Sequence, residues 1–261
     1  MILLIDFDSI LYTSVYKIVG IGAMRDAIEK YGKENAKQWL MEEVYNEGIN
    51  RCENELLKIQ NYIDSQIFQD ITGVELFITT CKNPFRKVLN PNYKSSRKPN
   101  NYVWMLRGHY QMNGAFFSDT HEADDLIADR AKELGKDNCI VISIDKDLKQ
   151  IGGYYWSYYK VRSFDMHGEP VLNEYGSQER EYKQKNIDYI TDDEAERIFW
   201  LSMLTGDSGD DIKGLHRVGP KTAEKILSQT KVNWFKTARE YIARGQKEDF
   251  KINYRLLKLG A

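Results

Sequence analysis

Carboxylates recur along this chain at the places where strands should end and helices should begin. They fall into four groups: Asp6; Glu122, Asp124 and Asp125; Asp145 and Asp147; and Asp207, Asp210 and Asp211. Like charges gathered in one cleft must be neutralised by protons or cations, and hard oxygen ligands favour Mg²⁺ or Mn²⁺ over zinc. The pattern therefore indicates a divalent-metal site that assists attack on phosphate.

Three short apolar segments, residues 2–5, 74–79 and 139–144, predict buried strands. Strands separated by helical stretches predict an α/β fold with a central, mostly parallel sheet flanked by helices. Ligands of such sheets bind at the carboxyl ends of the strands. Asp6 and Asp145 fall at two of these ends.

Two helices should connect these strands. The first covers about residues 35–71, which carry a partly regular apolar stripe. The second should run from Glu122 to Leu134 and stop at Gly135. Three acids in its first turn exceed what the helix dipole needs, although stabilisation of that dipole is the plain structural alternative. Asp145 and Asp147 likewise could simply form a turn that caps a short helix.

The second part of the chain predicts a separate helical unit. Residues 168–190 are polar and indicate a connector, with a boundary near 187, so we expect an α/β core over 1–186 and a helical region over 187–261. Thr191 and Glu194 form a capping box, and the helix that they begin should end before Gly206. The aromatic residues between 154 and 159 predict a strand pair that packs on the sheet.

Residues 212–227 predict a helix-hairpin-helix motif. The turn lies around Gly219, and Pro220 stands where the next helix begins. Backbone N–H groups at such a helix start hold a phosphate without reading the base sequence, and Lys221 and Lys225 add positive charge. A plain structural turn is the alternative.

Charge is segregated along the chain, although its net value is only −2. No Asp or Glu occurs from Leu76 to Ser118, a segment with seven cations: Lys82, Arg86, Lys87, Lys94, Arg97, Lys98 and Arg107. From Ile212 to Ala261, twelve Lys and Arg residues face four Asp and Glu residues. Two basic zones beside an acidic centre suit a polyanion that is bound by its phosphates, and chance clustering of surface charge is the alternative.

Three cysteines without a CxxC or Cys/His pattern support neither a disulfide framework nor a zinc site, and we expect a cytoplasmic protein. No apolar run approaches the roughly 18 residues of a membrane span, so we expect no membrane partner. We also expect a monomer.

Five motifs, taken in order, resemble those of the flap endonuclease and 5′-3′ exonuclease family, which includes the 5′-nuclease domain of bacterial DNA polymerases and exonucleases of bacteriophages. The motifs are Leu4–Asp6, Phe85–Lys87 with Tyr93–Arg97, Glu122–Asp125, Ile144–Leu148, and Gly206–Asp210 with the hairpin that follows. The resemblance covers most of the chain. It implies a two-metal nuclease that hydrolyses phosphodiesters near a free 5′ end or 5′ flap of DNA, or of an RNA primer on DNA. The compact size, without a fused polymerase, favours a bacteriophage origin and thus a bacterial host's cytoplasm.

The resemblance also implies roles for individual residues. The first of two Mg²⁺ ions, which Mn²⁺ could replace, would be held by Asp6, Glu122, Asp124 and Asp125, with Asp145 shared, and the second by Asp147, Asp207 and Asp210. Lys94 and Arg97 resemble the basic pair at the scissile phosphate. A basic, arch-like segment would span 82–121, and K⁺ often binds the hairpin in relatives. The implied DNA-binding residues are Arg86, Tyr93, Lys98, Gly214, Arg217, Gly219, Lys221, Thr222 and Lys225.

Three departures from the family pattern are visible. Thr79 stands where the family usually carries another aspartate, and Arg217 where the hairpin commonly has its first glycine. The 24 residues between Arg97 and Glu122 are few for an arch that threads a strand, which favours a more open entry. The helical material between Asp6 and Val74 has no assigned role.

Two other functions remain open from the residues. Asp6 and Asp8 after an apolar strand, with a later Gly-Asp-x-x-Asp, also suit a haloacid dehalogenase-like phosphatase, in which Asp6 would be the nucleophile and Asp8 an acid. A non-catalytic DNA-binding protein with a decayed acidic site is the other alternative, since Thr79 replaces an expected ligand.

Overall fold

The structure is a computed structural model that describes residues 1–19, 22–167, 169–172, 178, 180–228 and 233–260. Part of the predicted polar connector, at 168, 173–177 and 179, lies outside the described residues. None of the described helices is both long enough and apolar enough to cross a membrane. The three cysteines are free and buried.

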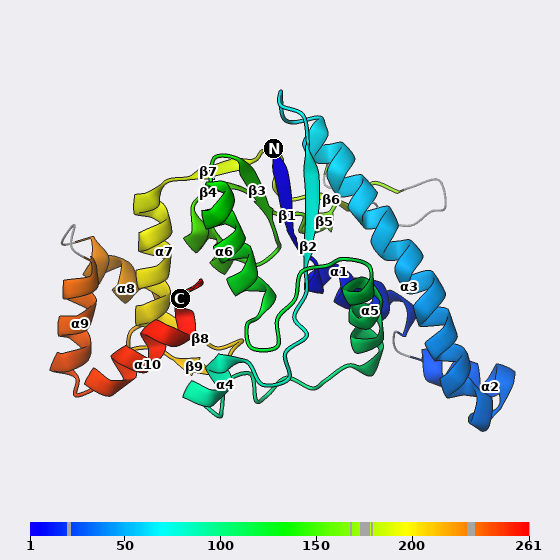
Figure 1. Ribbon diagram of the computed structural model, residues 1–261, viewed down its shortest axis with the longest axis horizontal. Helices are drawn as coiled ribbons and strands as arrows, with labels where there is room; N and C mark the ends of the chain where they lie inside the picture. The colour runs from blue at the N-terminus through cyan, green and yellow to red at the C-terminus, as the bar shows by residue number, and fades with distance from the viewer. Residues whose placement is uncertain (20–21, 168, 173–177, 179, 229–232, 261) are drawn as a thin grey trace.

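A five-stranded sheet forms the centre of the molecule, in the order β2-β1-β3-β4-β7 (Figure 1). Four strands are parallel, and β7 pairs antiparallel with β4 at one edge. Their bounds are β1 Ile2–Asp6, β2 Gly73–Phe77, β3 Cys139–Ile142, β4 Gly153–Trp156 and β7 Asp188–Ile190. The predicted α/β fold and its mostly parallel sheet are thus confirmed, and the three predicted strands form within two residues of their expected limits.

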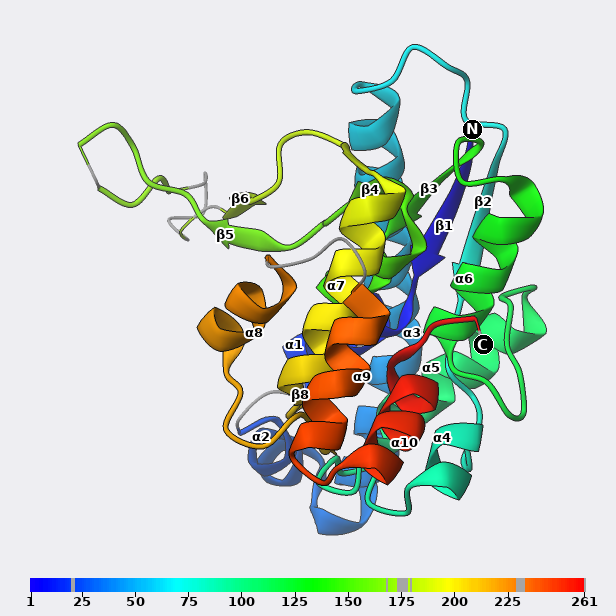
Figure 2. The ribbon, with the colours of Figure 1, turned by 90° about the vertical axis from the view of Figure 1, so that its left-hand side faces the viewer.

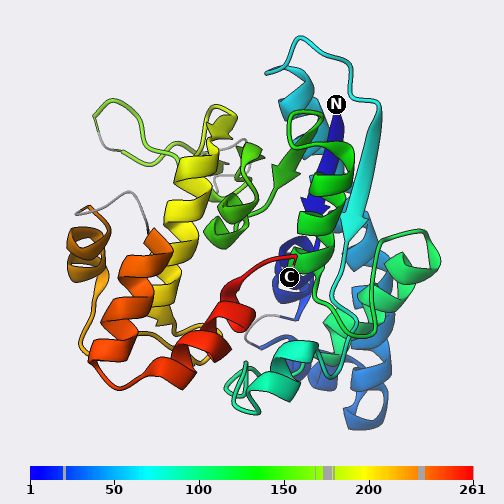
Figure 3. The same cartoon turned by 60° about the vertical axis from the view of Figure 1, so that its left-hand side comes forward.

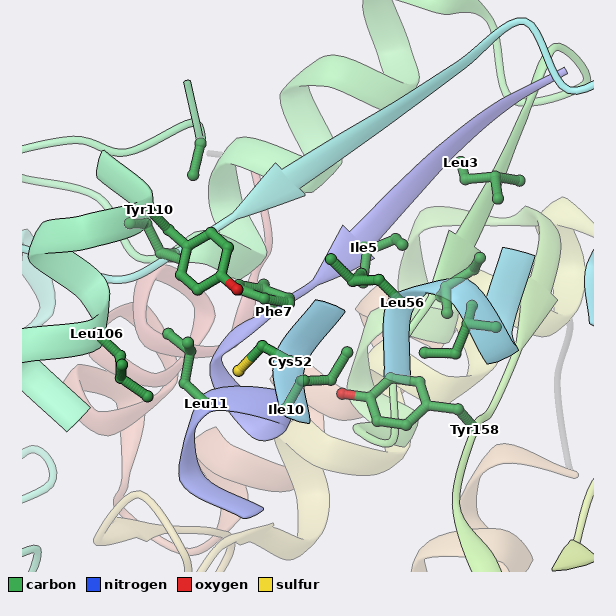
Figure 4. Close-up of a cluster of buried hydrophobic side chains, with 14 of the residues drawn as sticks. Leu3, Ile5, Phe7, Ile10, Leu11, Cys52, Leu56, Leu106, Tyr110 and Tyr158 are labelled. Atoms are coloured by element: carbon green, nitrogen blue, oxygen red, sulfur yellow. The ribbon is translucent and has the colours of Figure 1, made fainter. Parts of the chain in front are cut away.

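Helices cover both faces of this sheet because successive strand residues point to opposite sides. Leu3 and Ile5 of β1 belong to one buried cluster, and Leu4 belongs to another. The first cluster packs under α1 (Asp8–Ile18), α3 (Lys33–Asp64) and α5 (Asn101–Met112), as Figure 4 shows for Ile10, Cys52 and Leu106. The second packs under α6 (Ala123–Leu134) and the 3₁₀ helix η1 (Lys146–Ile151).

The remaining elements of this part lie around the sheet: α2 Ala23–Tyr31, α4 Phe85–Leu89, β5 Lys160–Arg162 and β6 Arg180–Tyr182. The β5–β6 pair is a separate small sheet that projects away from the central one (Figure 2). The aromatic residues 154–159 were expected to form a strand pair packed on the sheet. Instead β4 is itself a strand of the central sheet, because its large side chains are buried between the helices on both faces.

The C-terminal helices α7 (Asp192–Thr205), α8 (Pro220–Leu227), α9 (Asn233–Ala243) and α10 (Lys247–Leu257) gather around their own buried cluster (Figure 3). The predicted capping box of Thr191 and Glu194 begins α7, and Gly206 ends it. A boundary near 187 is not where this unit starts. The strand β7 follows that boundary and pairs with β4, so the helical part begins only with α7.

Two glycines hold the turn between α7 and α8 together. Gly206 and Gly214 lie at the short ladder of β8 (Gly206–Asp207) and β9 (Ile212–Lys213). A Cβ atom at Gly214 would stand 2.2 Å from the Thr205 carbonyl carbon and 2.3 Å from the Gly206 nitrogen. Neither atom can move away cheaply, because both are backbone.

We therefore expect Gly214→Ala to destabilise the protein by about 3 kcal/mol, the upper part of the usual range for overpacking. Thermal unfolding should show a midpoint lower by roughly 6–12 °C. Gly219→Ser is the matched control, since a Cβ at Gly219 meets nothing within 4 Å and serine is a good N-cap. Equal melting temperatures for the two variants would contradict this account of the turn.

Candidate active site

A pocket opens at the carboxyl ends of the parallel strands, where acidic and basic side chains meet. Its lining holds six acids and six cations. The acids are Asp6, Asp8, Glu122, Asp124, Asp145 and Asp210, and the cations are Lys82, Lys87, Lys94, Arg97, Lys98 and Arg107. All of these cations come from the acid-free segment of the sequence. The structure thus brings one basic zone and residues of all four acidic groups to the same place.

Asp6 lies at the floor of this pocket, at the last position of β1, and is 5% exposed. The Ser143 hydroxyl donates a 2.6 Å hydrogen bond to its Oδ2. Burial and, after it, the charges of Asp8 and Asp145 together raise the pKa of Asp6 to about 7, while the Ser143 hydrogen bond opposes them. Burial and the nearby Asp6 likewise raise the pKa of Asp124 well above its ordinary value.

These pKa shifts come first from burial and then from the negative charges of neighbouring carboxylates. A divalent cation would relieve the repulsion between these charges, and the available donors are carboxylate oxygens, which suit Mg²⁺ or Mn²⁺. Among the described residues, no three His, Cys, Asp or Glu side chains already converge as a formed metal site. The donor chemistry fits the expected metal, while the acids stand further apart than ligands of a bound ion would.

The second acidic motif continues directly from the sheet. Asp145 caps η1, because its Oδ1 accepts a 2.9 Å hydrogen bond from the Asp147 N–H. This cap is the structural alternative considered for the motif, and it coexists with a place for Asp145 in the pocket lining. Burial and, after it, the charges of Asp145 and Asp207 together raise the pKa of Asp147 to about 6. Asp147 and Asp207 therefore lie near each other, beside the pocket rather than in its lining.

Lys94 joins two acidic motifs that come from different parts of the chain. Its Nζ lies 2.7 Å from Glu122 Oε1 and 3.5 Å from Asp210 Oδ2. Its backbone N–H donates to the Asp210 carbonyl at 3.1 Å, and its φ of 52° is a left-handed conformation. Burial alone would lower the pKa of Lys94, but Glu122 and Asp210 raise it. The ammonium group therefore stays charged inside the pocket.

Arg97 and Lys98 follow at the rim of the pocket. The Arg97 guanidinium pairs with Asp210, its Nε donates to the Gly209 carbonyl at 3.2 Å, and its side chain remains 57% exposed. Lys98 is exposed and lines the same pocket. Both cations can reach a ligand without breaking the protein's core.

Tyr93 is not on the DNA-facing surface where the family resemblance placed it. Its ring is 2% exposed and belongs to the buried cluster of the C-terminal helices. Its hydroxyl donates to Glu122 Oε2 at 2.5 Å and lies 3.0 Å from Asp210 Oδ2. The ring is buried among apolar side chains and is not exposed, so Tyr93 orients two acids and cannot stack on a base.

Arg86 is also buried rather than part of a phosphate-steering surface, with 2% exposure. Its guanidinium forms two hydrogen bonds to both oxygens of Asp125, the second of them 2.7 Å long from Nη2 to Oδ1. Its Nε donates to the Leu256 carbonyl of α10 at 2.7 Å. Asp125 is consequently engaged by Arg86 and by the capping box of α6, and the structure places it outside the pocket lining.

Asp8 and Arg107 are pocket residues that the motifs did not assign to a nuclease site. Asp8 accepts a 2.9 Å hydrogen bond from Arg107 Nε and a 3.3 Å bond from the Thr79 N–H. Its carboxylate therefore reaches the end of β2, where Thr79 stands in place of an aspartate. The only indication of this in the sequence was Asp8 itself, which the sequence analysis considered only as an acid of the phosphatase alternative.

The hairpin residues lie apart from this pocket. Gly219 caps α8, and Lys221, Thr222 and Lys225 are exposed on that helix. Arg217 is exposed with a φ of 58°, so it adopts a left-handed conformation that the family's glycine would take without strain. Gly214 packs against the end of α7 and is only partly exposed. Helix α5, inside the segment expected to form an arch, packs on the core through Val103, Leu106 and Tyr110.

The buried Arg86–Asp125 pair gives a stability prediction. Arg86→Leu leaves Asp125 buried without its partner and should destabilise the protein by about 3–5 kcal/mol. Arg86→Leu combined with Asp125→Leu should recover part of this loss, because no unpaired charge then remains. Urea unfolding measures both variants, and a change below about 1 kcal/mol for the single variant would show that the pair is not a structural anchor.

No family model matches the chain. It is 33% identical over 147 residues to a 5′-3′ exonuclease of Aquifex aeolicus, covering 53% of this chain and 45% of that protein. It is 31% identical over 161 residues to flap endonuclease Xni of Shewanella sediminis, covering 55% of this chain and 53% of that protein. A match to DNA polymerase I of Borreliella burgdorferi, 30% identical over 159 residues, covers 56% of this chain and 16% of that protein.

The matched part thus spans about half or less of these three relatives. Among solved structures, the T5 D15 protein co-crystallised with metal ions has a TM-score of 0.60 at 13% identity, covering 99% of this chain and 89% of that one. The bacteriophage T5 D15 flap endonuclease in a complex with DNA and metal ions has a TM-score of 0.57 at 13% identity, with the same coverage. The chain has this fold, and its sequence confirms the resemblance to the flap endonuclease and 5′-3′ exonuclease family that its motifs predicted.

Proposed function

We propose that the protein is a Mg²⁺-dependent 5′-3′ nuclease that hydrolyses phosphodiester bonds near the 5′ end of DNA, including 5′ flaps and RNA primers on DNA. The pocket of six acids and six cations at the carboxyl ends of the strands carries this proposal. Acidic groups at its floor suit metal ions, and cations around them suit a polyanion. The names of the matched relatives support the same reaction.

Asp8 is paired with Arg107, so the metal ligands in this proposal are the other five acids that line the pocket and the two beside it: Asp6, Glu122, Asp124, Asp145, Asp210, Asp147 and Asp207. Asp125 is left to Arg86. Two bound Mg²⁺ ions, or Mn²⁺ in their place, would polarise the phosphate and lower the pKa of a nearby water. Ser143 supports this set of ligands, because its hydroxyl donates a hydrogen bond to Asp6 and accepts one from the Asp145 N–H.

Lys94 stabilises the charge that develops on the phosphate during hydrolysis. Its ammonium group now contacts Glu122 and Asp210, and it stays protonated, so it can turn to a phosphate oxygen without any change in charge. Arg97 and Lys98 at the rim contact the phosphates on either side and set the strand's position. Asp8 fixes Arg107 beside them through its 2.9 Å hydrogen bond.

The duplex backbone is held by the start of α8. Pro220 has no N–H and the Thr222 N–H donates to the Gly219 carbonyl at 3.0 Å, so the Lys221 N–H is the backbone donor offered at this helix start. The side chains of Lys221, Thr222 and Lys225 are exposed around it. Such contacts address phosphates and not bases. A K⁺ ion at this hairpin, and a monomeric enzyme, belong to the proposal through the family resemblance.

The phosphatase alternative is not supported. Its Gly-Asp motif should follow a strand of the central sheet, whereas Gly206–Asp210 follows helix α7. Asp8, which would act there as an acid, is held by Arg107 and the Thr79 N–H. A non-catalytic DNA-binding protein remains as an outcome of the experiment below.

Asp145→Asn should nearly abolish cleavage while leaving the fold intact. Asparagine keeps the oxygen that caps η1 but lacks the negative charge that a metal ligand supplies. Cleavage of 5′-labelled and internally labelled duplexes, with and without a 5′ flap, is measured in Mg²⁺ and in EDTA. Metal-dependent products that start at the 5′ end would establish the nuclease, and their lengths would separate flap cutting from exonucleolysis. DNA binding without cleavage by the unaltered protein would favour the decayed-site alternative.

Lys94→Ala should slow the chemical step more than it weakens DNA binding. Loss of a cation at the phosphate acts on the transition state, so single-turnover rates at saturating DNA should fall by roughly 10²-fold or more. The control is Lys132→Ala, which removes an exposed lysine on α6 far from the pocket lining. A loss of affinity with an unchanged single-turnover rate would reduce Lys94 to a steering role.

A further inference from the structure

A second hollow lies beside the active pocket, between α1, α3 and the β5–β6 pair, and its lining is rich in cations. Five basic and two acidic side chains contribute to it: Lys17, Arg51, Lys58, Lys160 and Arg180, with Glu47 and Glu55. We propose that this hollow is a second phosphate-binding site, which holds the backbone of the nucleic-acid substrate away from the bond that is cut. The inference rests on the proposed nuclease function, because it takes the same polyanion as its ligand.

The hollow shares a wall with the active site. Ile144 lines it and directly precedes Asp145 in the chain. Tyr158 also lines it, and the Tyr158 hydroxyl donates a 3.1 Å hydrogen bond to the backbone oxygen of Asp6. Figure 4 shows the Tyr158 ring beside Ile10, another lining residue. The floor between the two sites is therefore packed core that keeps them at a fixed separation.

Helix α1 runs between the two sites and contributes to both. Ser9 and Tyr12 line the active pocket, while Thr13 and Lys17 line the second hollow. A strand that leaves the active pocket over α1 would therefore meet the second hollow next. This order of sites along one helix favours a continuous backbone over a small free anion.

Charge in the hollow is not balanced within the protein. Arg51 pairs with Glu47 at 2.7 Å, and Lys160 pairs with Glu55 at 2.6 Å. No described carboxylate lies within ion-pair distance of the other three cations, Lys17, Lys58 and Arg180. An anionic ligand would complete the balance, and phosphates of a polyanion arrive as a row of single charges.

The environment of the donors points the same way. Burial lowers the pKa of Lys17, Glu55 opposes this, and the charges of Lys160 and Arg51 lower it again. Cations crowded together in this way repel one another, and a phosphate bound among them would replace this repulsion by attraction.

The site also gives a role to the helical insertion between β1 and β2. Arg51 and Lys58 stand on α3, about two turns apart on the helix, and Lys17 stands on α1. Cys52 and Leu56, which lie between the two α3 cations in sequence, are buried in the core under α1. One face of this long helix thus anchors it, and the neighbouring face presents the cations.

The double variant Lys17→Ala/Lys58→Ala tests the proposal. Its matched control is Lys30→Ala/Lys37→Ala, which removes the same charge from α2 and the start of α3, outside the hollow. Affinity for a flapped duplex is measured in EDTA at several salt concentrations. The test variant should bind roughly tenfold more weakly than the control, and its plot of log affinity against log salt should be shallower by about two.

Cleavage in Mg²⁺ separates this proposal from the nuclease function. Under single turnover at saturating DNA, the test variant should cut as fast as the unaltered protein, since the cations stand away from the scissile bond. If the unaltered protein cuts DNA but the test and control variants bind alike, the second site is refuted and the function stands. If the test variant binds more weakly although nothing is cut, the site stands and the nuclease function fails. Inorganic phosphate binding that is lost in the test variant while DNA affinity is unchanged would make this a small-anion site and overturn the proposal.

Discussion

Glu122 and Asp210 are bridged from two sides, and the arrangement of the active pocket depends on that junction. Glu122 caps α6, which packs on the central sheet, while Asp210 lies in the turn between β8 and β9 in the helical part. Lys94 contacts both acids from the pocket, and the Tyr93 hydroxyl contacts both from the core. Without these two residues, like charges would drive the acids apart. With them, one short segment between α4 and α5 joins two separately packed clusters into one site.

The elements on the two sides of this junction follow from local sequence patterns. Strands, α6 with its Gly135 stop, and the capping box of α7 follow from local patterns of apolar residues, acids and glycine, and the structure has all of them. Their carboxyl-end acids meet because parallel strands end at one edge. Short-range rules are therefore enough to predict that Asp6, Asp124 and Asp145 face the same pocket.

Those rules could not predict that long polar side chains would be buried. Arg86 and Tyr93 lie in a run of cations and resemble surface groups, yet each is 2% exposed. Their partners, Asp125 for Arg86 and Asp210 for Tyr93, stand 39 and 117 residues further along the chain. Charge and spacing in the sequence do not show that such distant groups will form a buried network. Asp8 was not predicted as a residue of the nuclease site for a related reason, because its place there depends on a contact with Thr79 just beyond β2.

The near-neutral net charge hides a separation of acids and cations in space, which brings together residues that are far apart in the chain. The acid-free segment delivers six of its seven cations to the lining of the active pocket, and only Arg86 turns inward. Helices α1 and α3 collect a second group of cations on the other side of the Asp6 and Ile144 wall. Acids stay at the sheet edge, where burial makes their charge costly unless a cation joins them. A fold that places its negative charges at the floor and its positive charges around them can attract metal ions and a polyanion together. Metal ions neutralise the acids that would repel the polyanion, and the polyanion neutralises the cations that would repel the metal ions.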